Sequence, residues 1–336
     1  MELHLIAQSG SKTGLGHVKR CITLYHFLKS NTSLNPLFYV FSHEIINLNL
    51  DIKDYTYIYQ EINFEILIKN LFDKKRQIFI FDLNEQEFSL EFTFFLKNLK
   101  TSQNTLIVSI DSLLSYKNLI DYYFIPSFYY SEKLKNLDKK KLSFGWDHYL
   151  INNNFSPEIK TFKLKKLLIL TGGSDVSNLG EKLPVKIDEI IDIKCDINWV
   201  IGPFAKTPEY YNINKHNWSF QKSLKNLDHL YQFSNYAISV YGVSFFELMY
   251  YGVPTVVFSP YGNKDLNELN QISKLGIAIV AFDYIDAVNK LNHLLNNDEL
   301  SRSMSNKAKS IFSKNGSNTF LELLKKLIKN KWQMDF

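Results

Sequence analysis

A histidine stands directly behind a glycine-rich turn near the start of the chain. The apolar run LHLIA at 3–7 leads into a segment in which Gly14 and Gly16 precede His17. Glycines let a ligand approach the backbone closely, and the free N–H groups at a helix start attract an anion. Because histidine titrates near neutral pH, it can take a proton from water or a hydroxyl group. We therefore interpret His17 as a general base and place Arg20 among the ligand-binding residues.

The same segment also has a purely structural interpretation, in which His17 caps the helix and Arg20 forms a surface ion pair. It does not match the dinucleotide-binding fingerprint, because Lys19 stands where the third glycine of G-x-G-x-x-G would fall. We therefore do not expect a nicotinamide dinucleotide as cofactor.

A second glycine-rich turn follows an apolar run in the middle of the chain. The run KLLIL ends at Leu170, and TGGSD occupies 171–175. Small residues and free amides there can face a phosphate, whereas in an ordinary turn Ser174 or Asp175 would cap the next helix. The candidate binding residues of this turn are Gly172, Gly173, Ser174 and Asp175.

A third candidate turn lies in SVYGVSFFELMYYGVPTVVF at 239–258. Gly242, Val243 and Ser244 place backbone amides at a helix start, where a pyrophosphate binds favourably. Glu247 lies about one turn into that helix and can accept hydrogen bonds from both hydroxyls of a ribose. The spacing therefore predicts a nucleoside diphosphate site in the second half of the chain.

Two further pairs of residues complete this candidate site. Asn270 and Gln271 offer amide groups to sugar hydroxyls, although such a pair on a helix is usually just solvated. Ile201 and Gly202 follow a preceding strand and are expected to form a wall for the base.

These residues need a framework that brings them to the ends of strands. Short apolar runs alternate with longer amphipathic stretches, which is typical of α/β proteins with parallel, doubly wound sheets. The first half has predicted strands at 3–7, 79–83 and 105–110 and predicted helices at 61–74 and 87–100. The second half has predicted strands in KLLILT, INWVIG, YAISV, PTVVF and IAIV and predicted helices at 243–251, 266–274 and 284–295. Ligands bind at the carboxyl ends of such strands.

The polar stretch NNNFSP at 152–157 predicts a break between two domains. We assign 1–153 to an N-terminal Rossmann-like domain that carries the histidine loop and the sugar or acceptor side. We assign 154–336 to a C-terminal Rossmann-like nucleotide-binding domain. The amphipathic segment 320–332 is expected to close that second domain, the alternative being a helix that lies on a membrane surface.

Composition disfavours several other classes of protein. The chain of 336 residues is long enough for two hydrophobic cores, and its net charge of +5, with scattered lysines, does not indicate nucleic-acid binding. The cysteines, Cys21 and Cys195, lie in different predicted domains, so neither a disulfide nor a metal site is expected. Neither a signal peptide nor a transmembrane run is evident. We expect a cytoplasmic monomer whose partner is a small molecule.

Together these motifs resemble the UDP-sugar hydrolase family of pseudaminic-acid biosynthesis, within the MurG-like GT-B superfamily. The matching segments, in order, are GLGHVKRCITL, LTGGSDVSN, SVYGVSFFELMYYGVPTVVF and NQISKLGIAIV. The resemblance implies two Rossmann-like domains that face each other across a cleft. It also implies cleavage of UDP from a 2,4-diacetamido-2,4,6-trideoxy hexose at the anomeric C–O bond, with inversion. UDP is then part of the substrate, and no metal or separate cofactor is implied.

The resemblance also implies roles for individual residues. His17 matches the base that activates water. Gly242 and Ser244 match the phosphate loop, and Glu247 matches the ribose ligand. The pair at 270–271 matches polar side chains that face the sugar.

Three segments depart from the family pattern. Tyr241 stands where the family has the first of two glycines, and Asp82-Leu83-Asn84 stands where it has Asp-x-Tyr or Asp-x-His. The segment Gly145–Tyr149 replaces the usual Gly-Pro-Lys-Tyr. Two other functions therefore stay open: a GT-B glycosyltransferase with a hydroxyl acceptor, and a non-catalytic protein that binds nucleotide-sugars.

Overall fold

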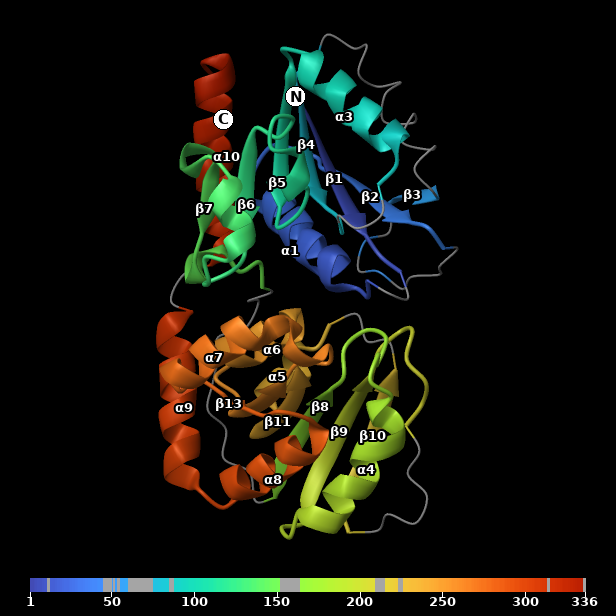
Figure 1. The fold of residues 1–336 in the computed structure, drawn as a ribbon, viewed down its shortest axis with the longest axis vertical. Coiled ribbons are helices and arrows are strands. Elements are labelled where there is room, and N and C mark those ends of the chain that lie inside the picture. The colour runs from blue at the N-terminus through green and yellow to red at the C-terminus, as the bar shows by residue number, and fades with distance from the viewer. Residues whose placement is uncertain are drawn as a thin grey trace. The chain divides into compact units, whose positions relative to one another are not determined.

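The chain forms two compact units, seen in a computed structural model (Figure 1). Unit 1 comprises Met1–Ile151 and Lys314–Phe336, and unit 2 comprises Asn152–Ser313. The residues that the structure describes are 1–10, 13–44, 50, 52, 55–59, 75–84, 88–151, 164–208, 215–222, 226–312 and 315–334. The predicted linker at 152–157 and the predicted helix at 61–74 lie outside the described residues.

Unit 1 is built on a parallel sheet, and seven of its strands lie within the described residues, in the order β3-β2-β1-β4-β5-β6-β7. The strands are β1 (Glu2–Gln8), β2 (Leu37–Ser42), β3 (Thr56–Tyr59), β4 (Gln77–Asp82), β5 (Thr105–Ile110), β6 (Tyr122–Ile125) and β7 (Leu142–Phe144). The three strands predicted for the first half are confirmed as β1, β4 and β5. The register pairs Ile6 of β1 with Tyr39 of β2 on one side and with Phe81 of β4 on the other.

The order of the strands reverses at β1. The chain runs from β1 to β2 and β3 on one side, and then returns to place β4 on the other side of β1. The carboxyl ends of β1 and β4 therefore flank the topological switch point, where open α/β sheets bind ligands. The glycine turn with His17 follows β1 at this point.

Helices cover both faces of the unit 1 sheet. Helix α1 (Gly16–Asn31) buries Val18, Cys21, Leu24, Tyr25 and Leu28, which recur at helical spacing. Helix α3 (Leu90–Thr101) begins at the cap Ser89, whose hydroxyl accepts from the N–H of Phe92. It packs on the sheet face that carries Ile6, Phe81 and Ile107. Because side chains alternate along a strand, Asp82 points to the opposite face, toward α1.

The last helix, α10 (Gly316–Trp332), corrects the prediction that it closes the second domain, because it packs on unit 1. A Cβ on Gly316 would lie 2.3 Å from the carbonyl oxygen of Tyr149, so the helix start lies directly against that backbone. Phe320 packs edge-on against Phe124, with ring centroids 5.0 Å apart, and Trp332 Nε1 donates to the carbonyl of Gln103 at 3.0 Å. The amphipathic pattern predicted the helix, but periodicity does not specify which core receives the apolar face.

Unit 2 repeats the same plan with a parallel sheet of order β10-β9-β8-β11-β12-β13 across the described residues. Its strands are β8 (Lys165–Leu170), β9 (Cys195–Ile201), β10 (Asn217–Lys222), β11 (Tyr236–Val240), β12 (Thr255–Phe258) and β13 (Ile279–Val280). All five strands predicted for this half are confirmed, and β10 was not predicted. Here the switch point lies between β8 and β11.

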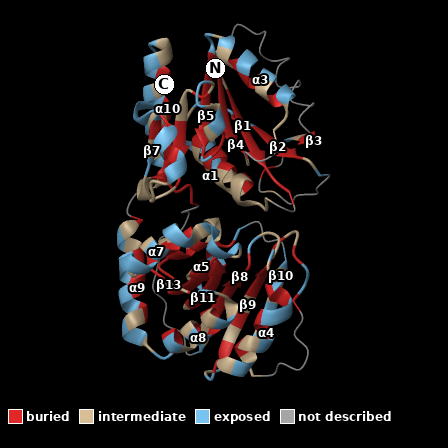
Figure 2. Cartoon of the chain, viewed as in Figure 1, coloured by how far each residue is buried: buried red, intermediate tan, exposed pale blue. Residues whose placement is uncertain are grey.

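The helices of unit 2 are α4 (Leu179–Ile190), α5 (Asp228–Gln232), α6 (Val243–Tyr250), α7 (Leu266–Leu275), α8 (Tyr284–Leu295) and α9 (Asp298–Ile311). The predicted helices at 243–251, 266–274 and 284–295 correspond to α6, α7 and α8. In both units the buried residues follow the strands and the inner faces of the helices (Figure 2). Within the part of the chain that the structure describes, no helix combines the length and apolar character needed to cross a bilayer.

His4 is a buried histidine of the β1 strand. Its side chain is 0% exposed, its ring stacks on Phe79 with centroids 4.5 Å apart, and its Nδ1 lies 3.2 Å from the Tyr39 hydroxyl. Burial lowers the pKa of His4 to about 4, and the charge of Glu2 offsets only part of this effect. The folded state therefore resists protonation that the unfolded state accepts.

We expect acidification to destabilise the protein through His4. Since the folded pKa lies below the unfolded one, stability is retained above about pH 6.5 and is lost as the pH falls toward 4. Between pH 7 and pH 5 this single group should cost about 2 kcal/mol. Urea unfolding of wild type and His4→Phe at both pH values measures the difference. The exposed His26→Gln variant is the control and should keep the wild-type slope; an unchanged slope in His4→Phe would contradict the assignment.

Candidate functional site

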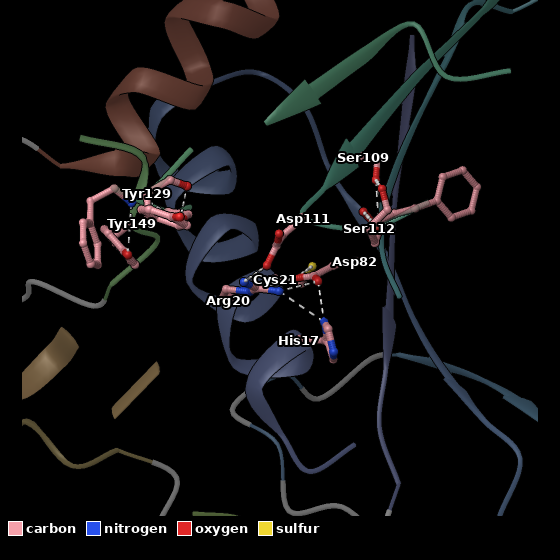
Figure 3. A network of polar contacts seen from close by, with 12 residues as sticks. His17, Arg20, Cys21, Asp82, Ser109, Asp111, Ser112, Tyr129 and Tyr149 are labelled. Carbon is pink, nitrogen blue, oxygen red and sulfur yellow. Dashed lines mark hydrogen bonds and ion pairs between the residues drawn. The ribbon is translucent and has the colours of Figure 1, made fainter. Parts of the chain in front are cut away.

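The first candidate site joins α1 to the end of β4. His17 is the second residue of α1, and its Nδ1 lies 2.5 Å from Oδ1 of Asp82, the last residue of β4 (Figure 3). The side chain of Asp82 is 0% exposed and that of His17 is 21% exposed. The histidine is therefore held by a buried carboxylate while part of its ring faces solvent.

Arg20 binds the same carboxylate through two parallel contacts. Its Nε donates to Oδ2 of Asp82 at 3.0 Å, and its Nη2 donates to Oδ1 at 2.7 Å. Residues three apart share one face of a helix, so His17 and Arg20 both reach Asp82 from α1. The Nη1 atom of Arg20 also lies 3.6 Å from Oδ2 of Asp111, the residue after β5. The alternative in which Arg20 forms a surface ion pair is wrong, because its partner Asp82 is fully buried.

These contacts keep Asp82 ionised. Burial by itself would raise the pKa of Asp82, but the charges of Arg20 and His17 and their hydrogen bonds outweigh it, so the pKa lies below its usual value. Burial likewise opposes the charge of Arg20, and the carboxylates of Asp82 and Asp111 more than compensate, raising the pKa of Arg20. A bidentate arginine–carboxylate pair of this kind is among the stronger hydrogen-bonded arrangements in proteins.

The ionised state of Asp82 also determines the tautomer of His17. A carboxylate only accepts hydrogen bonds, so Nδ1 of His17 must carry the proton that it donates to Asp82. The 3.2 Å approach of Arg20 Nη2 to the same Nδ1 is then a contact between two donors and not a hydrogen bond. In the neutral ring the lone pair is left on Nε2, the atom able to accept a proton from a ligand.

The predicted glycine turn lies directly before α1. Gly14 has a φ of 68°, in the left-handed region that favours glycine, and its N–H donates to the carbonyl of Gly10 at 2.8 Å. Gly16 is the first residue of α1, and the preceding Leu15 provides no side-chain cap. The residue before α1 therefore does not cap the first backbone N–H groups of the helix. Uncapped N–H groups are what a helix start needs to bind an anion.

Sequence reasoning missed Asp82 and Asp111 as site residues. Asp82 entered it only as part of a departure from a family pattern, and Asp111 was not considered. Asp111 follows the run predicted as a strand at 105–110, and Asp82 lies near the end of the run predicted as a strand at 79–83. An aspartate at the carboxyl end of a buried strand next to the switch point was the available signal.

The second candidate site lies at the carboxyl ends of β8 and β9 in unit 2. Gly172 has a φ of 83°, and a Cβ on Gly202 would lie 2.3 Å from the carbonyl oxygens of both Gly172 and Gly173. The structure thus brings these three predicted residues into direct backbone contact. Only glycine fits at position 202, because a Cβ there would collide with the neighbouring turn. Backbone packing alone therefore explains this glycine, and no bound ligand is needed to account for it.

Asp175 caps the next helix, as the structural alternative for this turn predicts. Its Oδ1 accepts from the N–H of Leu179 at 3.0 Å and its Oδ2 accepts from the N–H of Gly180 at 2.8 Å, which caps the start of α4. Both carboxylate oxygens are therefore used by the backbone. Ser174 lies beside it in the same turn and is partly exposed.

The α6 segment contains the residues predicted to bind the nucleotide. Gly242 precedes α6, and a Cβ placed there would meet no atom within 4 Å. Val243 and Ser244 begin the helix and are partly exposed. Oε2 of Glu247 accepts a hydrogen bond from the Tyr231 hydroxyl at 2.6 Å.

Tyr231 is a member of this site that the sequence did not reveal. Its side chain is 2% exposed, and burial and then the charge of Glu247 raise the pKa of Tyr231 well above its usual value. The phenol therefore stays protonated and donates to Glu247, while the Ser244 hydroxyl donates to the phenol oxygen. Tyr231 thus links two residues that were predicted to bind the nucleotide.

The remaining predicted site residues of unit 2 lie on β9 and α7. The side chain of Ile201 is 4% exposed and belongs to the core of unit 2, and its role as a wall for a base stays a prediction. An aliphatic residue at the end of a central strand is buried by default. Asn270 is exposed and Gln271 is partly exposed on α7, and their role toward a sugar stays a prediction.

The departures from the family pattern have structural explanations. Tyr241 packs between Phe245 and Phe246, with ring centroids 6.0 and 5.6 Å away. The N–H of Asn84 donates to Oε1 of Gln8 at 2.6 Å and ties β4 to β1. The segment Gly145–Tyr149 packs against α10 through the contact at Gly316 described above.

The described residues contain no group of three or more His, Cys, Asp or Glu side chains that could hold a metal ion. Cys21 and Cys195 are both buried and free.

The two parallel-sheet units match GT-B structures in fold. Acinetobacter baumannii MurG has a TM-score of 0.63 at 14% identity, covering 97% of this chain and 100% of that chain. The S. aureus MnaA-UDP co-structure has a TM-score of 0.62 at 13% identity, covering 100% and 99%. UDP-GlcNAc 2-epimerase from Neisseria meningitidis bound to UDP-GlcNAc has a TM-score of 0.59 at 14% identity, covering 97% and 100%. At these identities the similarity shows the fold.

Sequence comparison adds two findings. Residues 205–311, in unit 2, match the family model described as glycosyl transferases group 1. The uncharacterized protein MJ1062 of Methanocaldococcus jannaschii is 27% identical over 278 residues, which are 76% of this chain and 55% of that protein. The chain therefore spans about half the length of this relative.

The Arg20 contact makes a strong prediction about stability. Arg20→Met leaves the buried carboxylate of Asp82 without its cation, and such a loss costs about 3–5 kcal/mol near neutral pH. Without the guanidinium the pKa of Asp82 rises, so the deficit should shrink as the pH is lowered and the carboxyl becomes neutral. Urea unfolding of Arg20→Met at pH 7.5 and pH 5 measures both effects. The double variant with Asp82→Asn should recover most of the loss; a cost below about 1 kcal/mol in the single variant would place the ion pair in solvent.

Proposed function

We propose that this chain is an enzyme that breaks the anomeric C–O bond of a UDP-sugar, with His17 as the general base and water as the acceptor. The observation that carries the proposal is the 2.5 Å contact of His17 Nδ1 with the buried, ionised Asp82. Such a pair orients a histidine and stabilises the cation that forms when it takes a proton. The fold is shared with the S. aureus MnaA-UDP co-structure and with the Neisseria meningitidis epimerase structure bound to UDP-GlcNAc.

The proposed reaction is a hydrolysis with water as the nucleophile. A water oxygen attacks the anomeric carbon, its proton passes to Nε2 of His17, and the bond from that carbon to the diphosphate oxygen breaks with inversion. UDP departs as an anion and needs no proton from the enzyme. The new imidazolium lies against Asp82, whose negative charge is already in place before the reaction, as electrostatic preorganisation requires.

The nucleotide is assigned to unit 2. The amides at Gly242 and the start of α6 suit a pyrophosphate, because a helix N-terminus attracts an anion. Glu247 is proposed to accept hydrogen bonds from the ribose hydroxyls, and Tyr231 positions it through the 2.6 Å hydrogen bond. The residues 205–311 that match the glycosyl transferases group 1 model include this whole segment.

The sugar is proposed to be a 2,4-diacetamido-2,4,6-trideoxy hexose, as in pseudaminic-acid biosynthesis. This part rests on the motifs GLGHVKRCITL and LTGGSDVSN and on the positions of His17 and Glu247 within the fold. UDP would be both a substrate moiety and a product, without a separate cofactor.

A glycosyltransferase that uses a hydroxyl acceptor is the second candidate. The match of 205–311 to the glycosyl transferases group 1 model favours it specifically. The same His17 would then deprotonate the acceptor hydroxyl in place of water. Incubation of the protein with the UDP-sugar and no acceptor separates the two, since a hydrolase releases free sugar and UDP in equal amounts.

The first functional prediction concerns His17. His17→Gln should lower kcat on the UDP-linked diacetamido sugar by about 10²–10⁴-fold, because general-base assistance contributes that much, while the Kd for UDP stays unchanged. An NMR time course on a panel of UDP-linked diacetamido sugars follows both the bond cleaved and the anomer released. His26→Gln, which alters an exposed histidine of the same helix, should behave as wild type. Full turnover in His17→Gln would remove this residue from the mechanism.

The second functional prediction concerns the ribose. Glu247→Gln should weaken UDP binding by about 10–100-fold, because a hydrogen bond to a charged group contributes about 1.5–3 kcal/mol. Tyr231→Phe should weaken it about tenfold, since it removes one ordinary hydrogen bond to the glutamate. Calorimetry with UDP and 2′-deoxy-UDP makes the test specific: wild type should prefer UDP, and both variants should lose much of that preference. Glu299→Gln, at an exposed position of α9, is the control. An unchanged preference in Glu247→Gln would exclude the ribose role.

A further inference from the structure

Asp111 stands at the carboxyl edge of the unit 1 sheet in an unusual backbone conformation. It follows β5 directly, and β5 is the neighbour of the β4 strand that ends in Asp82. Its φ of 46° lies in the left-handed region, which costs a non-glycine residue of the order of 1 kcal/mol or more. Strained residues of this kind persist only where the surroundings hold them in place.

The surrounding turn is fixed by buried hydrogen bonds. The Ser109 hydroxyl donates to the carbonyl of Ser112 at 2.5 Å, and the Ser112 hydroxyl donates to the carbonyl of Phe81 at 3.3 Å (Figure 3). Leu113, also left-handed with a φ of 55°, accepts at its carbonyl from the Tyr123 hydroxyl at 2.8 Å. The turn therefore presents the side chain of Asp111 from a rigid support.

Charge balance does not require Asp111. Arg20 already makes two hydrogen bonds to Asp82, so these two charges cancel. The carboxylate of Asp111 lies 3.6 Å from Arg20, beyond ordinary hydrogen-bonding distance, and its side chain is 45% exposed whereas that of Asp82 is 0% exposed. Burial raises the pKa of Asp111, the charge of Arg20 partly offsets this, and Asp111 is the accessible carboxylate of the pair.

We infer that Asp111 is a sugar-binding residue that selects sugars with neutral hydrogen-bond donors and rejects sugars that carry a carboxylate. The inference rests on the proposed function, because it assumes that the sugar lies at His17. Asp111 and His17 both flank the guanidinium of Arg20, and the inference places a sugar bound at His17 beside this carboxylate. A fixed carboxylate accepts from hydroxyl and amide N–H groups and repels a second anion, which is how like charge produces specificity.

Asp111→Asn and Asp111→Gly form a matched pair of variants. Both remove the charge, and both residues accept a positive φ, so the turn is preserved. Calorimetry with UDP, UDP-N-acetylglucosamine and UDP-glucuronate gives the ratio of the two UDP-sugar affinities without relying on turnover. Wild type should favour UDP-N-acetylglucosamine, and both variants should reduce that ratio by about tenfold while the Kd for UDP stays the same.

The outcomes are distinct. A reduced ratio in both variants supports the inference, and an unchanged ratio in either one overturns it, because each lacks the charge. If wild type binds none of the three nucleotides, the proposed function fails first, independently of Asp111. Thermal unfolding of the two variants confirms that they are folded when measured.

Discussion

The negative charge of Asp82 is buried at the end of a central strand, and the arrangement of unit 1 depends on how that charge is matched. Arg20 covers both carboxylate oxygens and His17 binds one of them, so α1 is fixed against β4 in both rotation and position along its axis. The glycine turn before α1 must then be short and left-handed at Gly14 to join β1 to a helix in this position. One electrostatic constraint thus links β1, α1 and β4 at the switch point of the sheet.

Unit 2 places its candidate site at the same point of the same topology but uses different chemistry. The features at its switch point are glycines: Gly202 lies against the carbonyls of the turn at 172–173, and Gly242 leaves the start of α6 sterically open. Side-chain charge enters only through Glu247, whose partner is the neutral phenol of Tyr231. Backbone amides suit a diphosphate, while a histidine with a matched carboxylate suits proton transfer. The two units therefore carry different chemistry at the same point of their topology.

The sequence was most informative where one local signal sufficed. Buried apolar runs predicted β1, β4 and β5, since a strand covered on both faces reads as continuous apolar sequence. The strands β3 and β7 are short and partly exposed, so they carry no such run. The helical pattern at 320–332 predicted a helix but not its core, because amphipathicity describes one face and not its partner. His17 was found from its turn, whereas Asp82 lies 65 residues away and becomes its neighbour only through the strand order. Tyr231 was missed for the same reason.

The network at Asp82 is better explained by chemistry than by stability. Buried ion pairs often contribute little net stability, because desolvation of the charges offsets their attraction, and apolar residues of similar volume can replace them at little cost. If the network had only a structural role, all of its charged side chains could be buried together. Instead the exposure of the side chains differs across the network. Asp82 is fully buried, whereas His17 and Asp111 are partly exposed at the edge of the sheet. A buried charge that holds a partly exposed imidazole in one tautomer is an arrangement suited to proton transfer, in keeping with the role proposed for His17.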